Sequence, residues 1–196
     1  MTVIRLFSFQ AARRGFDEIL RTVMIPDLLA MPGIMDLCVG RQGPDDLGPR
    51  IVASVWESRE TMLDAIGDRL GTFHPEHLDA TSDQRLEICE LGVAWRSDAG
   101  PMRILRVLRG EVRTGELEAY VEDVQHGVEL DAVDQHGPTT LYLGKLGGDT
   151  FVTVSAWREW TDIELATGGN VNHPRATRHP ERLIDWDVQH FEIVQR

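Results

Sequence analysis

The hexapeptide Val52-Ala53-Ser54-Val55-Trp56-Glu57 recurs 101 residues later as Thr153-Val154-Ser155-Ala156-Trp157-Arg158, with the two tryptophans aligned. Further along, His74-Pro75-Glu76 recurs as His179-Pro180-Glu181, now at an offset of 105 residues. Matches that occur in the same order indicate an internal duplication of the chain. Inserted residues near positions 168–170 explain the change of offset.

The order of the predicted elements is the same in both halves. Runs of β-branched and aromatic residues predict strands in the first half at 2–10, 35–42, 50–57 and 85–94. Helical spacing predicts a helix over 16–31, bent or interrupted at Pro26, and a second helix that begins after an N-cap at Ser58. In the second half, strands are predicted at 102–112, 139–146, 150–157 and 187–194, and helices at 114–133 and 160–166. The order β-α-β-β-α-β is the split βαβ pattern of ferredoxin-like folds.

We therefore predict an α+β protein of two ferredoxin-like repeats, residues 1–97 and 102–196, joined by a short polar turn. In the first strand, Ile4 and Leu6 fall on one face, and Phe7 and Phe9 fall on the other. A sheet that is covered on one face only would alternate apolar and polar residues. We expect helices to cover one face and the sheet of the other repeat to cover the second. This packing gives a barrel with pseudo-twofold symmetry.

Composition and charge narrow the classes of partner. The chain has 196 residues, a formal net charge of -12 and scattered arginines, so nucleic acid is not an expected partner. Its uninterrupted apolar runs are far shorter than the ~20 residues that a membrane-spanning helix needs. The first residues run directly into a strand pattern without a secretion signal, which favours a cytoplasmic protein. Cys38 and Cys89 lack metal-site spacing and are expected to be buried free thiols.

Two sets of motifs carry a resemblance to a known family. They are Met31-Pro32-Gly33-Ile34 before the second strand and Val55-Trp56-Glu57-Ser58-Arg59-Glu60 at a strand-to-helix junction, echoed by Ala156-Trp157-Arg158-Glu159. With them the chain resembles the antibiotic-biosynthesis-monooxygenase group of the dimeric α/β barrel superfamily. Two copies of such proteins normally associate, so the resemblance implies an intramolecular pseudo-dimer, with further oligomerisation left open. Members include cofactor-free oxygenases of aromatic polyketides, haem-degrading enzymes and proteins without an established activity.

The haem-degrading members of that superfamily use an Asn on the first strand, a Trp on the second helix and a His just after it. At the first two positions this chain has Phe7 and Ala65, and its second half has Leu108 and Ala166. Haem degradation by that mechanism is therefore not expected.

The resemblance and the residue chemistry together give a set of candidate site residues. Histidine can act as an acid or a base near neutral pH, which makes His74 and His179 the candidate catalytic residues. The candidate ligand-binding residues are Arg5, Trp56, Arg106, Trp157 and His173. They would line a pocket between helices and sheet that holds a small planar, apolar or aromatic molecule for attack by oxygen, without a cofactor.

Structural roles compete with these functional ones. A Trp at a strand end, such as Trp56 or Trp157, is typically a core anchor whose indole N–H finds one nearby acceptor. Glu118, Glu122 and His126 follow the spacing of one helix face, which is typical of a solvated surface. The loop at 168–175 is most simply interpreted as a plain surface loop.

Two other functions remain open from the sequence. A non-catalytic ligand-binding or stress-response module would use the same pocket without turnover. A haem-binding protein, as in chlorite-dismutase-like and dye-decolorising peroxidase-like proteins, would need His173 or His179 as its proximal ligand. The two repeats have diverged unequally, so a working pocket in only one half is compatible with the sequence. The sequence does not indicate which half that is.

Overall fold

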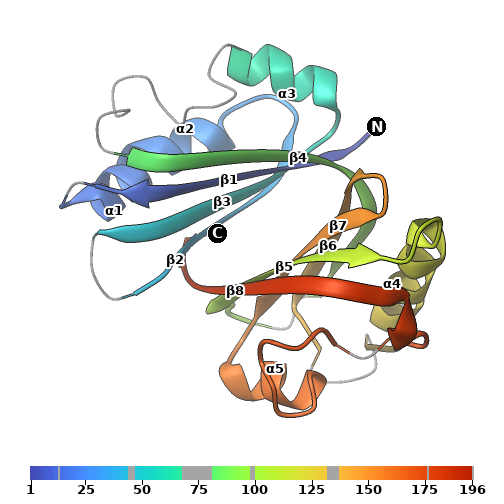
Figure 1. Ribbon diagram of the computed structural model, residues 1–196. Helices are drawn as coiled ribbons and strands as arrows, with labels where there is room; N and C mark the ends of the chain where they lie inside the picture. The colour runs from blue at the N-terminus through green and yellow to red at the C-terminus, as the bar shows by residue number, and fades with distance from the viewer. Residues whose placement is uncertain are drawn as a thin grey trace. The chain divides into compact units, whose positions relative to one another are not determined.

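The computed structural model describes residues 1–12, 14–43, 47–67, 81–97, 100–131, 137–175 and 177–195 (Figure 1). Its contacts divide the chain into unit 1, formed by Met1–Ile88 and Phe191–Arg196, and unit 2, formed by Cys89–His190. Two long strands, β4 (Thr81–Arg96) and β8 (Leu183–Gln195), each begin in one unit and end in the other. The strands are antiparallel where their registers are resolved, and the hydrogen-bonded order is β1-β3-β2-β8-β5-β7-β6-β4.

In unit 1, strand β3 (Gly48–Trp56) lies between β1 (Val3–Ala11) and β2 (Ile34–Arg41). The end of β8 pairs with β2, with Val39 opposite Gln195 and Arg41 opposite Glu192. Side chains on both faces of β1 are buried, including Leu6 on one face and Phe7 on the other. The expectation that both faces of this strand are covered is confirmed.

The first predicted helix is divided into three short pieces. Helix α1 (Phe16–Ile19) leads into a π-turn over Leu20–Met24, and α2 (Ile25–Leu29) follows. Pro26 lies in the first turn of α2, where its missing N–H is tolerated. The π-turn just before it accommodates the change in the backbone hydrogen-bond pattern. The predicted interruption at Pro26 is therefore confirmed, and it takes the form of a π-turn.

The second helix of unit 1 begins where its cap predicts. Helix α3 (Arg59–Ile66) follows Ser58, whose extended backbone lets its Oγ accept from the backbone N–H of Thr61 at 3.0 Å. Its buried residues, Met62 and Ile66, pack with Trp56 and Val3. This contact joins the helix to the end of β3.

Unit 2 follows the same order of elements. Its members are β5 (Ile104–Val112), α4 (Leu117–Asp131), β6 (Thr140–Gly147), β7 (Thr150–Trp157) and α5 (Trp160–Ala166). Strand β7 lies between β5 and β6, and β6 pairs in turn with the end of β4. Strand β8 starts four residues earlier than predicted, directly after a 3-10 turn at Pro180–Arg182.

The recurring Ser-x-Trp sequence has the same local structure in both units. Ser54 stands opposite Arg5, and its Oγ accepts the indole N–H of Trp56 at 2.9 Å. Ser155 stands opposite Arg106 and accepts the indole N–H of Trp157, also at 2.9 Å. The prediction that both tryptophans are anchored by one nearby acceptor is confirmed.

The predicted α+β class is confirmed by these antiparallel strands and their helices. None of the described helices is both long and apolar enough to cross a membrane. Neither cysteine forms a disulfide; Cys89 is buried as expected, whereas Cys38 is partly exposed, so the expectation of burial was wrong for Cys38.

Candidate functional site

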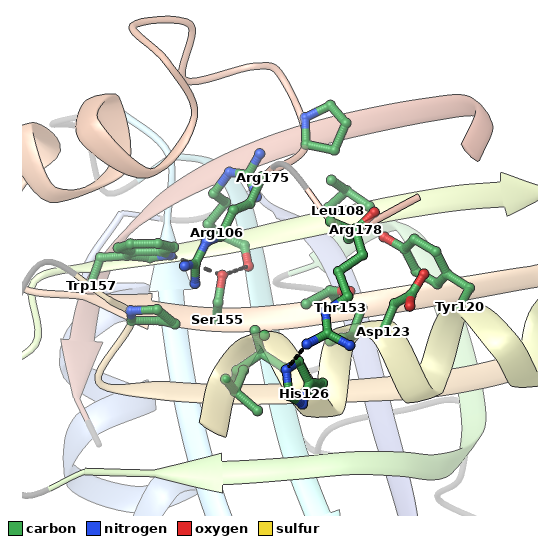
Figure 2. Close-up of a pocket in the computed structure, with 17 residues that line it drawn as sticks. Arg106, Leu108, Tyr120, Asp123, His126, Thr153, Ser155, Trp157, Arg175 and Arg178 are labelled. Atoms are coloured by element: carbon green, nitrogen blue, oxygen red, sulfur yellow. Dashed lines mark hydrogen bonds between the residues drawn. The ribbon is translucent and has the colours of Figure 1, made fainter. Parts of the chain in front are cut away.

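Unit 2 contains a cavity of about 290 Å³ between its sheet, helix α4 and the loop after α5 (Figure 2). Its floor consists of alternate residues of β5 and β7 together with one residue of β6. They are Arg106, Leu108, Thr153, Ser155, Trp157 and Leu141. Alternate residues of a strand share one face, so the pairing of β5 with β7 brings these side chains together. The volume is near the lower end of the range for small-molecule pockets.

Helix α4 provides the wall of the cavity. Tyr120, Asp123 and Gly127 follow the spacing of one helix face, and His126 lies at the edge of that face. The ring of Tyr120 packs on Phe151 with centroids 4.6 Å apart. Burial raises the pKa of the Tyr120 hydroxyl, and the nearby Arg106 opposes this rise only in part. At neutral pH the hydroxyl is therefore protonated and able to donate a hydrogen bond.

The carboxylate on this wall already has a cationic partner. Arg182 Nη1 donates to Asp123 Oδ2 at 2.5 Å and to the carbonyl oxygen of Ala119 at 2.9 Å. Arg182 is the last residue of the 3-10 turn and is not among the residues that line the cavity. The negative charge of Asp123 is thus balanced from outside the cavity.

Arg106 holds the loop over the floor. Its Nη2 donates to the carbonyl oxygen of His173 at 2.6 Å and its Nε donates to that of Val171 at 3.3 Å. Burial lowers the pKa of Arg106 to about 10, so the guanidinium stays charged at neutral pH. The loop at 168–175 is largely exposed, as the sequence predicts, and two of its carbonyls also anchor it to the floor of the cavity.

The same loop forms the roof of the cavity. Pro174 is buried, and Arg175, Thr177 and Arg178 also line the space. In Figure 2, Arg178 reaches from the loop to helix α4, where it donates to Nε2 of His126. A guanidinium has only donors, so Nε2 accepts in this arrangement and the proton of a neutral imidazole lies on Nδ1.

His126 corrects a sequence interpretation. Glu118 and Glu122 are exposed as expected, but His126 is partly buried and lines the cavity. The assignment of all three residues to one solvated face was therefore wrong for His126.

The structure brings two of the predicted site residues into the cavity, Arg106 and Trp157. His179 lies on an exposed turn, with its Nδ1 3.2 Å from Oε1 of Glu181. The ring of His173 packs against that of Trp186, with the ring centroids 5.1 Å apart. Neither histidine side chain lines the cavity, although the backbone of His173 holds Arg106. His74 lies outside the described residues.

The counterparts in unit 1 are packed into a hydrophobic core. Arg5 is buried with its guanidinium carbon 5.1 Å from the centre of the Phe7 ring, and Trp56 is fully buried. Phe7 occupies the position of Leu108, and with Phe9 and Phe16 it packs against the first helical segments. Aromatic side chains thus fill the space under these helices in the described part of unit 1.

The two histidines predicted as proximal haem ligands, His173 and His179, are not among the described residues that line the cavity. The histidine that does line it is His126, which accepts from Arg178. Among the described residues, no group of three His, Cys, Asp or Glu side chains is placed to hold a metal ion.

No family model matches the sequence, and no curated protein matches it either. Solved structures do share its fold. A "putative monooxygenase" from Fusobacterium nucleatum subsp. nucleatum has a TM-score of 0.74 at 8% identity, over 99% of this chain and 93% of that one. An anthrone oxidase-like protein has a TM-score of 0.65 at 14% identity, over 99% and 92%. A variant chlorite dismutase from Candidatus Nitrospira defluvii has a TM-score of 0.61 at 9% identity, over 98% and 91%.

At these identities the likeness concerns the fold and not the activity. It extends over nearly the whole of each chain, and the order of elements in the two units is the order that the motifs predicted. The chain therefore has the fold of the dimeric α/β barrel, or ferredoxin-like, superfamily.

Proposed function

We propose that the cavity of unit 2 binds a compact, planar and mostly apolar organic molecule, and that the protein oxygenates this molecule without a cofactor. The observation that carries the proposal is the composition of the cavity. Leu108, Leu141 and Trp157 offer apolar surface to a ring, while Tyr120 and Arg106 offer donors for an oxygen on that ring. A mostly apolar pocket with a few convergent polar groups is typical of small-molecule sites.

The proposed reaction needs no electrons beyond those of the substrate. An activated methylene group reacts with one molecule of dioxygen to give a carbonyl group and one molecule of water. Both C–H bonds of the methylene carbon break, and the carbon is oxidised while dioxygen is reduced. One oxygen atom forms the new carbonyl, and the other leaves as water with both hydrogens. The protein has to remove a proton from the carbon and stabilise the resulting enolate oxygen.

Residues of the cavity are suited to both tasks. His126 Nε2 carries a lone pair on the wall of the cavity and is the candidate base. The protonated hydroxyl of Tyr120 and the charged guanidinium of Arg106 are candidate donors to the enolate oxygen. Donors in a buried site stabilise developing charge more strongly than water-exposed donors do.

One observation favours a second candidate function. Arg178 donates a hydrogen bond to Nε2 of His126, so in this arrangement the lone pair of the candidate base is not available to a substrate. A non-catalytic binding module would leave this contact intact when its ligand is bound. The two functions therefore differ in turnover and not in the site of binding.

Oxygen uptake with anthrone separates the two functions. Anthrone is a planar molecule with an activated methylene group, and one of the similar structures is that of an anthrone oxidase-like protein. We expect the wild-type protein to consume one molecule of dioxygen per anthraquinone formed, at a rate above that of buffer alone. His126→Gln is expected to lower kcat by about 100-fold or more with a small effect on KM, because a general base typically contributes that much.

Two results would decide against oxygenation. Anthrone that binds, as measured by quenching of tryptophan fluorescence, but oxidises at the rate of buffer alone would identify a binding module. An unchanged kcat in His126→Gln would remove His126 as the base.

A further inference from the structure

We infer that the natural ligand of this cavity is an aromatic acid that carries an anionic oxygen, and that Arg178 is the residue that selects it. This inference rests on the proposed function only in placing a planar ligand in the cavity of unit 2. It adds the charge of the ligand and the residue that recognises this charge.

The first support is the balance of charge around the cavity. Among the described residues that line it, the guanidinium groups of Arg106 and Arg178 face one carboxylate, that of Asp123. Asp123 is already paired with Arg182, so its charge does not offset these two arginines. Because the chain as a whole has a net charge of -12, this excess of positive charge is a local feature.

The second support is the nature of the acceptors that these two arginines meet. Within the described part of the chain, Arg106 donates to two backbone carbonyls and Arg178 donates to an imidazole nitrogen. All three acceptors are neutral. A carboxylate adds its own negative charge to a bond whose donor is already charged, so an anionic ligand is a better acceptor for a guanidinium than these neutral groups are.

The position of Arg178 makes it the more accessible of the two. Arg106 is buried and its bonds hold the loop in place, whereas Arg178 is exposed and comes from the roof of the cavity. In Figure 2, Leu108 and Thr153 lie between the end of the cavity at Trp157 and the end at Tyr120. A ring over Leu108 would lie on the floor beneath the roof from which Arg178 extends.

Recognition of the acid also bears on the base. A ligand oxygen that draws Arg178 away from His126 frees the lone pair of Nε2. A ketone oxygen and a carboxylate both accept from a guanidinium, and the carboxylate attracts it more strongly because it carries a full charge. This exchange accounts for a resting structure in which the base is blocked.

The test compares two ligands of equal shape, 2-naphthoate and 2-naphthamide, by isothermal titration calorimetry at neutral pH. We expect the wild-type protein to bind 2-naphthoate about tenfold more tightly or better, a difference of about 1.4 kcal/mol, because only the carboxylate adds an opposite charge to the hydrogen bond from Arg178. Arg178→Gln is expected to remove this preference and to leave the affinity for 2-naphthamide within about twofold. Arg103→Gln, which removes an exposed arginine outside the cavity, is the matched control and should bind both ligands as the wild type does.

The outcomes separate this inference from the proposed function. Equal affinity for the two ligands, or a preference that persists in Arg178→Gln, overturns the inference and leaves the cavity as a neutral binding site. No binding of either ligand overturns the inference together with the assigned cavity. A preference that depends on Arg178 in a protein that does not oxidise anthrone supports the inference and rejects the oxygenase. Because Arg178 is exposed, we expect its variant to keep the wild-type circular dichroism spectrum and melting temperature.

Discussion

Replacing Asp17 by alanine is expected to lower the free energy of unfolding by about 3–5 kcal/mol, as breaking a buried ion pair does. Asp17 lies in α1 and is 5% exposed. Its Oδ1 accepts from Arg50 Nε at 2.8 Å, and its Oδ2 accepts from Arg41 Nη1 at 3.2 Å. The side chain of Arg50 is completely buried, so the substitution leaves its charge without this carboxylate inside unit 1.

Chemical denaturation followed by circular dichroism measures this loss. The matched control is Glu192→Ala, because Glu192 is an exposed partner of the same Arg41 at 2.8 Å. Exposed ion pairs contribute about 0–1 kcal/mol, so this variant should unfold almost as the wild type does. An Asp17→Ala protein as stable as Glu192→Ala would show that the buried pair does not hold α1 on the sheet.

Replacing Leu108 by phenylalanine is expected to weaken binding of 2-naphthoate or anthrone by about 10- to 100-fold. Phe7 occupies the equivalent position in unit 1, where aromatic side chains fill the space under the helices. A second ring in a cavity of about 290 Å³ competes with the ligand for the same space. Relief of such overpacking requires about 1–3 kcal/mol, which corresponds to the stated loss of affinity.

The reverse substitution, Phe7→Leu, is the control for this prediction. It removes part of a ring from the packed core of unit 1 and should lower stability without changing the affinity for the ligand. Both variants can be compared by calorimetric titration and by thermal unfolding. Normal binding by Leu108→Phe together with lost binding by Phe7→Leu would place the ligand in unit 1.

The anchored tryptophans could be predicted because their signal is local. A serine stands two positions before each tryptophan, and alternate residues of a strand lie on the same face. The acceptor of each indole N–H therefore lies next to it on the same strand. The order of elements was predictable for a similar reason, since hydrophobic spacing and turn residues act within each half. The presence of a cavity in one unit depends on differences such as Phe7 in place of Leu108. The effect of such a difference can be judged only when the packing of the helices on the sheet is known.

The roles of His126 and Arg178 could not be found in this way. Residues four apart on an α-helix are about 40° out of line, since each residue turns about 100°. From Glu118 to His126 this drift adds up to about 80°, which brings His126 to the edge of the wall of the cavity while Glu118 faces solvent. Arg178 lies in a loop without periodicity, and its place over the cavity depends on the bonds between Arg106 and the loop carbonyls.

Nuclear magnetic resonance of the tryptophan indole groups tests most directly whether the ligand binds in unit 2. The chain has five tryptophans, and each gives its own indole N–H signal. Trp157 lines the cavity, and Trp56 has the same hydrogen bond in unit 1, so the second signal is an internal control for the first. On titration with 2-naphthoate or 2-naphthamide, whichever binds more tightly, we expect a saturable shift of the Trp157 signal, assigned with Trp157→Phe, and a constant Trp56 signal. A shift of Trp56 with Trp157 unchanged, or no shift of either signal at saturation, would contradict the assignment of the cavity in unit 2 as the binding site.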